Sequence, residues 1–157
     1  MGKEMANMYS QIYIQIVIVV RGRQNLIQTN WRDALFKYIS GIIKNKGQKP
    51  IIVNGVGDHV HIFIGLKPAI AISDLIRDIK SNATNFINQN RFIIGKFEWQ
   101  EGAGVFSYSH SQIDAVYKYI ANQEDHHKKR TFREEYLEFL VKNEIDFKKE
   151  YLFEFYE

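Results

Sequence analysis

Apolar residues recur at every second position near the N-terminus. In YSQIYIQIVIVV, residues 9–20, the alternating isoleucines would share one face of a strand, because successive side chains point to opposite faces. β-branched residues then fill both faces toward the end of the segment, as in a strand that is covered on both sides. The pattern predicts a central strand over residues 10–20.

Four later segments repeat their apolar residues with the period of a helix. The first predicts a helix over residues 31–46, with Asn30 as its cap. The second predicts a helix capped by Ser73, and the third a helix that begins near Ser111. A fourth, shorter helix is expected over residues 133–142.

Shorter runs between these helices have the composition of strands. PIIVNGV and HVHIFIG lie on either side of a turn at Gly57 and Asp58, which predicts a hairpin within residues 51–65. FEWQ at 97–100 and GVFSYS at 104–109 are interpreted as further strand material. The resulting order, β-α-β-β-α-β-α, predicts an α+β fold with an antiparallel sheet and helices packed on its faces.

The composition is that of a folded protein of one domain. The chain has 157 residues, of which 45% are hydrophobic and 25% charged, so we expect one domain over residues 1–157, with about 143–157 as a C-terminal tail. The absence of cysteine excludes disulfides, thiolate metal sites and thiol nucleophiles. No segment has the apolar core of a signal peptide or the length of a membrane span, so we expect a cytoplasmic protein with no membrane partner. The net charge of +3 permits a nucleic-acid partner without requiring one.

His59 and His61 are two residues apart on a predicted strand. Their side chains should therefore project from the same face, while Val60 and Ile62 point to the other. Two neutral imidazoles held in this way can chelate one divalent ion. The alternative is that both rings only form hydrogen bonds with the backbone at the edge of the sheet. Asp58, next to the pair, is interpreted as a turn-forming residue.

Tyr119 and Gln123 form a second candidate pair on the third predicted helix. Residues four apart share one face of a helix, so a phenol and an amide would be presented together. An amide oxygen suits Mg²⁺ or Mn²⁺, and a phenol can act as a nucleophile on a phosphate that a bound ion polarises. Tyr117 is the rival nucleophile, but its spacing fits the apolar stripe, so we expect it in the core.

These segments together resemble the single-tyrosine HUH transposases of the insertion-sequence 200/605 type. HUH denotes histidine, a bulky hydrophobic residue and histidine, here His59, Val60 and His61. The resemblance is carried by NGVGDHVHIFIGL, SDLIRDIKSNATNFI and FSYSHSQIDAVYKYIANQEDHH, and it extends to YSQIYIQIVIVVRGRQNLI and WRDALFKYISGIIKNKG. It therefore spans nearly the whole chain, and it implies the ferredoxin-like or RRM-like HUH fold.

The resemblance also implies an activity. Members of the family cut single-stranded DNA beside imperfect hairpins at the ends of a mobile element, through a 5′-phosphotyrosine intermediate. By position, Tyr119 matches the nucleophile, and His59, His61 and Gln123 match the ligands of a divalent ion, Mg²⁺ or Mn²⁺. The family works as a homodimer whose sheets join edge to edge, and the tyrosine helix of one subunit can complete the site of the other.

Basic residues could form a track for the DNA backbone, since Arg and Lys give affinity through phosphates. The candidates are Arg21, Arg23, Arg77, Lys80, Lys128, Lys129 and Arg130. His126 and His127, beside the last three, could contact phosphate or simply interact with a helix dipole. Two other functions stay open: a protein that binds hairpins without cutting them, and a metal-dependent hydrolase of small phosphoesters that uses water as nucleophile.

Overall fold

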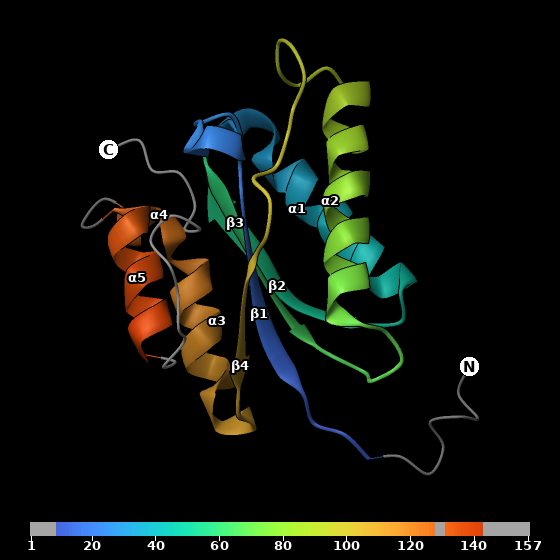
Figure 1. The fold of residues 1–157 in the computed structure, drawn as a ribbon, viewed down its shortest axis with the longest axis vertical. Helices are drawn as coiled ribbons and strands as arrows, with labels where there is room; N and C mark the ends of the chain where they lie inside the picture. The colour runs from blue at the N-terminus through green and yellow to red at the C-terminus, as the bar shows by residue number, and fades with distance from the viewer. Residues whose placement is uncertain (1–8, 128–130, 143–157) are drawn as a thin grey trace.

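A four-stranded antiparallel sheet forms the centre of the molecule (Figure 1). The computed structural model describes residues 9–127 and 131–142. The strands are β1 (Tyr13–Val19), β2 (Lys49–Val56), β3 (His59–Gly65) and β4 (Gly104–Tyr108), in the order β2-β3-β1-β4. The predicted α+β class, the order of elements and the hairpin of β2 and β3 are confirmed.

β1 lies inside the sheet, as its apolar sequence predicts. It pairs with β3 on one side and β4 on the other, and Val17 lies opposite His61 while Val19 lies opposite His59. The strand begins at Tyr13, later than the predicted residue 10, because pairing with both neighbours starts there.

Two helices cover one face of the sheet. They are α1 (Thr29–Asn45) and α2 (Ile72–Gln89), which in Figure 1 lie together on one side of the strands. Both begin slightly earlier than predicted, so Asn30 and Ser73 lie in the first turn and no side chain caps either helix. The core on this face joins the even-numbered residues of β1 and β3 to the helices, and includes Ile16, Ile18, Val60, Ile62, Leu35, Ile39, Leu75 and Ile79.

The opposite face carries the C-terminal helices. After a short 3₁₀ turn, η2 (His110–Gln112), come α3 (Ile113–Ala121), α4 (Gln123–His127) and α5 (Phe132–Lys142). Val116 and Ile120 of α3 pack on Phe63 of β3, and a second cluster joins β1 to α5 through Val17, Val19, Phe106, Tyr136 and Leu140. The odd-numbered residues of β1 and β3 therefore face α3 and α5.

Three predictions about elements were wrong. FEWQ is not a strand, since a single bridge joins Trp99 to Val20. Its apolar residues, Phe97 and Trp99, pack against each other in the core. The third predicted helix is broken at Asn122 into α3 and α4. Tyr117 is 46% exposed instead of buried, since Val116 and Ile120 occupy the face toward the sheet. The predicted tail, about 143–157, lies outside the described residues.

Candidate active site

The two histidines of β3 project from the sheet toward α3 and α5. Both side chains are fully buried, and their ring centroids are 5.1 Å apart. Val60 and Ile62 point into the core on the other face. The predicted placement of both rings on one face is confirmed.

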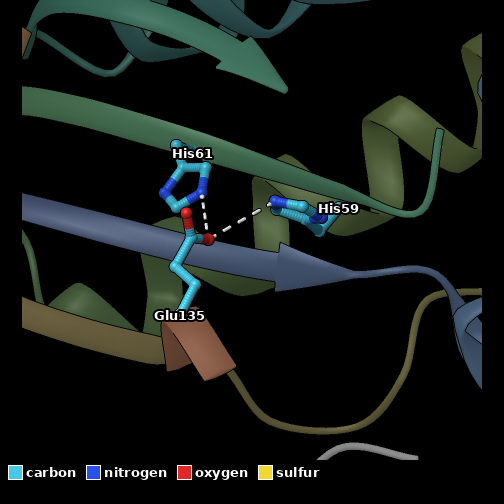
Figure 2. A group of neighbouring side chains, drawn as sticks. All are labelled: His59, His61 and Glu135. Carbon is cyan, nitrogen blue, oxygen red and sulfur yellow. Dashed lines mark hydrogen bonds and ion pairs between the residues drawn. The ribbon is translucent and has the colours of Figure 1, made fainter. Parts of the chain in front are cut away.

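Glu135 of α5 reaches between the two rings (Figure 2). Its Oε1 lies 3.2 Å from Nε2 of His61 and 3.7 Å from Nε2 of His59. The residue is 1% exposed, although an isolated carboxylate is costly to bury without partners. His59, His61 and Glu135 offer ligand atoms that all lie within 4.8 Å of one another, so they form a group that can hold a metal ion.

Sequence reasoning missed Glu135. A signal was present in the segment FREEYLEFL, where residues 132, 135, 136, 139 and 140 recur as one stripe of a helix. Four members of that stripe are apolar or aromatic, and the fifth is Glu135. A carboxylate in an apolar stripe is uncommon unless it is paired or binds a cation.

The candidate nucleophile lies beside this group. The Tyr119 hydroxyl donates a hydrogen bond to Oε2 of Glu135, and the Tyr119 ring centroid lies 6.0 Å from that of His61. The phenol is half-buried. One carboxylate therefore contacts the tyrosine with one oxygen and both histidines with the other.

Gln123 also meets the histidines. Its side chain is fully buried at the start of α4, and its Oε1 lies 3.2 Å from Nε2 of His59. Its amide donates to the Tyr119 carbonyl oxygen at 3.5 Å, across the break between the helices. The structure thus brings Tyr119, Gln123, His59 and His61 together within one chain.

Asp58 holds the ring of His59 from behind. Its Oδ1 accepts a hydrogen bond from Nδ1 of His59 at 2.7 Å, and its Oδ2 lies 2.9 Å from Nε of Arg23. With the proton on Nδ1, the lone pair of Nε2 points at Glu135 and Gln123, which is how carboxylates orient metal-binding histidines. Asp58 is therefore more than a turn residue.

The pKa values of Asp58 and His61 follow from these contacts. Burial works to raise the pKa of Asp58, but the hydrogen bond from His59 and the charges of His59, Arg23 and His127 outweigh it and lower the pKa. Burial lowers the pKa of His61, and the contact with Glu135 offsets this only in part. Asp58 is therefore ionised and His61 is a neutral imidazole near pH 7, the form that binds metal.

His127 lies on the other side of His59. Its Nε2 is 3.2 Å from Oε1 of Gln123 and 3.5 Å from Oε2 of Glu135, and its ring centroid is 4.6 Å from that of His59. Its side chain is 15% exposed. The ring is turned into the site, and is not simply displayed at a helix end.

The predicted basic track is divided by the structure. Arg77 and Lys80 lie on α2, which covers the face of the sheet opposite to the histidines. The ammonium of Lys80 donates to the carbonyl oxygens of Gln100 and Gly102, and so holds that loop. Arg23 is engaged with Asp58.

Two of the basic candidates are exposed. Arg21 pairs with Glu98, and Arg77 pairs with Asp74 and Asp78. Contact of these arginines with DNA stays a prediction. Residues 128–130 lie outside the described part of the chain, as does the side chain of His126.

The donor atoms have the spacing that a bound ion requires. Two ligands that each lie about 2.1 Å from one ion, at tetrahedral or octahedral angles, are about 3.0–3.4 Å apart. The separations from Nε2 of His59 to Gln123 and from Nε2 of His61 to Glu135 are both 3.2 Å, and that from His59 to Glu135 is 3.7 Å. The two separations of 3.2 Å fit a divalent metal, and the third is slightly longer than that range.

Comparison with known families agrees with the geometry. The sequence profile of the family described as Transposase IS200 like matches residues 8–123, about three quarters of the chain. The chain belongs to this family. The matched span includes His59, His61, Tyr119 and Gln123, and it ends before His127 and Glu135.

Solved transposase structures share the fold of this IS200-like protein. A crystal structure of a protein from Deinococcus radiodurans R1, assigned as a transposase, aligns with a TM-score of 0.57 at 18% identity, covering 74% of this chain and 94% of that one. A REP-associated tyrosine transposase bound to a REP hairpin aligns with a TM-score of 0.59 at 15% identity, covering 77% and 72%. A search of curated proteins found no match. Among the described residues, no helix combines the length and apolar character needed to cross a membrane.

Proposed function

We propose that this IS200-like protein cuts and rejoins single-stranded DNA at hairpin-bearing ends of a mobile element, with Tyr119 as the nucleophile. One observation carries the proposal: Glu135 contacts the Tyr119 hydroxyl with one oxygen and the His59 and His61 pair with the other. A phenol held beside a cluster of metal-binding donors is the arrangement that a metal-assisted attack on phosphate requires.

Each residue has a part in the proposed step. His59, His61, Gln123 and Glu135 would hold Mg²⁺ or Mn²⁺, which supplies charge stabilisation at the scissile phosphate. The Tyr119 oxygen forms a bond to phosphorus while its proton passes to the Glu135 carboxylate. The bond from phosphorus to the 3′-oxygen breaks, and that oxygen takes up a proton and leaves as a 3′-hydroxyl. The 5′-phosphotyrosine keeps the ester energy, so rejoining reverses the step without a nucleotide triphosphate.

Dimerisation is part of the proposal. β2 and β4 are the edge strands of the sheet, so either could pair with a second copy and extend it. Within one chain Tyr119 already lies beside its own His61, so a composite site is not needed for the two to meet. In the family that the sequence resembles, the tyrosine helix of one subunit can complete the histidine site of the other. A site built from two subunits therefore remains part of the proposal.

A labelled single strand that carries the hairpin from the DNA beside the gene tests this function. Incubation with Mn²⁺ should give a covalent protein–DNA adduct, and Tyr119→Phe should abolish it. Tyr117→Phe is the matched control, because Tyr117 is exposed on the same helix and should not be needed. Adduct formation by the Tyr119→Phe variant at the wild-type rate would overturn the assignment. Tight hairpin binding without any adduct would instead support a protein that binds and does not cut.

A further inference from the structure

Three imidazoles surround the oxygens of Gln123 and Glu135, although the HUH motif accounts for two of them. We propose that His127 is a third imidazole ligand of the metal ion, and that the site therefore selects Mn²⁺ or Co²⁺ over Mg²⁺. This inference rests on the proposed function of the same site, because it assumes that His59 and His61 bind a metal.

The position of His127 matches that of a ligand. Its Nε2 is 3.2 Å from Oε1 of Gln123, the same separation that the oxygen has from Nε2 of His59. Its distance to Oε2 of Glu135 is 3.5 Å. All of these lengths are close to the spacing of about 3.0–3.4 Å between neighbouring ligands of one ion. An ion held by Gln123 and Glu135 would thus lie next to the ring of His127.

The rings form a compact cluster centred on His59. Its centroid lies 5.1 Å from that of His61 and 4.6 Å from that of His127, and both pairs meet edge to face. His127 approaches from α4, which lies against β2, the strand that pairs with the histidine strand. An interaction with the helix dipole requires only that the ring lie near the end of α4. Here Nε2 of His127 points at the side-chain oxygens of Gln123 and Glu135.

The kinds of donor atoms decide which metal is favoured. Mg²⁺ prefers oxygen ligands and keeps much of its water, whereas imidazole nitrogen suits first-row transition ions. Three ring nitrogens with one carboxylate and one amide oxygen are a set that favours Mn²⁺ and, more strongly, Co²⁺. His127 lies beyond residue 123, where the match to the family profile ends, so this nitrogen is contributed by the chain's own C-terminal part.

Pulsed EPR spectroscopy of Mn²⁺ bound to protein with isotopically labelled histidine tests the inference directly. The nuclear couplings count the coordinated imidazoles, and we expect three in the wild type and two in His127→Gln. His110→Gln is the control and should keep three, since His110 is exposed in η2, which precedes α3. Two imidazoles in the wild type would overturn the proposal, and this count decides even if the His127 variant does not fold.

Calorimetric titration supplies an independent test of selectivity. His127→Gln should weaken Co²⁺ and Mn²⁺ binding by about tenfold or more, and Mg²⁺ binding much less, because Mg²⁺ gains little from a nitrogen ligand. Equal weakening of all three ions, or none, contradicts the proposal. Tyr119→Phe should keep all three imidazoles, so a failure of His127 as a ligand and a failure of Tyr119 as a nucleophile are separable.

Discussion

The carboxylate of Glu135 contacts more of the site's side chains than any other group described above. It contacts Tyr119, His59 and His61, and it is almost fully buried. Replacing it with glutamine keeps the shape and an acceptor for the phenol but removes the negative charge that attracts a cation. We expect Glu135→Gln to weaken Mn²⁺ binding by about tenfold or more and to slow formation of the adduct.

The control for this substitution is Glu138→Gln, which changes an exposed glutamate about one turn further along the same helix. It should leave both Mn²⁺ affinity and the rate of adduct formation close to the wild-type values. If Glu135→Gln binds Mn²⁺ as tightly as the wild type, Glu135 is not a ligand and acts through Tyr119 alone.

At the residue scale the sequence predicted four of the side chains that the structure brings together, namely His59, His61, Tyr119 and Gln123. The pairing of His59 and His61 follows from the two-residue period of a strand, and that of Tyr119 and Gln123 from the near-repeat of a helix after four residues. Glu135 and His127 could not be placed in the same way, because no local period relates them to residues on β3. Only the docking of α4 and α5 on the sheet brings them to the histidines.

The placement of α3 depends on a contact with the neighbouring strand β2. The Asn54 side chain donates to the carbonyl oxygens of Ile120 at 2.8 Å and Ala121 at 3.3 Å, which are the last residues of the helix. Asn54 lies opposite His61 in the strand register, so this contact fixes the end of α3 beside the site.

Removing the Asn54 amide should therefore affect the nucleophile more than the metal. We expect Asn54→Ala to lower the free energy of unfolding by about 1–2 kcal/mol and to slow adduct formation, while Mn²⁺ affinity stays close to wild type. Denaturant unfolding, adduct kinetics and calorimetry measure the three effects. Asn45→Ala, at the exposed end of α1 on the other face of the sheet, is the control. An unchanged adduct rate in a destabilised Asn54→Ala protein would show that this contact does not position Tyr119.

At the scale of elements, the hydrophobic periods predicted the order of strands and helices but not where the chain leaves regular structure. Phe97 and Trp99 are two residues apart, as apolar residues of a strand are. Their side chains instead pack against each other and the core in a segment that is not a strand. The sequence around the break at Asn122 contains no proline or glycine, so the break could not be predicted from it. It separates Tyr119 from Gln123 onto different helices while leaving both beside the histidines.

The whole molecule should lose stability on acidification when it holds no metal. Burial lowers the pKa of His61 below its usual value of about 6.5, with Glu135 and His59 as its charged or titratable neighbours. The unfolded chain then binds a proton more readily than the folded one, so unfolding is favoured as protons are added. The stability contributed by neutral His61 is complete above about pH 6.5 and is lost as the pH falls through the folded pKa.

Denaturant unfolding of metal-free protein at about pH 8, 6.5 and 5 measures this effect. His61→Gln should flatten the dependence, since glutamine does not titrate, whereas His110→Gln should retain it. A dependence in His61→Gln as steep as in the wild type would show that another group is responsible.

The three-layer arrangement of the molecule, with the sheet between two sets of helices, accounts for what the sequence could predict of function. A strand buried on both faces must present one side to α1 and α2, and the histidines occupy the side that remains for the C-terminal helices. That separation places Arg77 and Lys80 of α2 on the face of the sheet opposite to the histidines. Charge in the sequence does not reveal which face a residue occupies.

Mass spectrometry of the trapped protein–DNA adduct identifies the nucleophile. After digestion of protein and DNA, we expect a 5′-linked nucleotide on the peptide that contains Tyr119, with the fragment ions placing it on that residue. A nucleotide on Tyr117, or on any other residue, would contradict the assignment of the phenol beside Glu135 as the nucleophile.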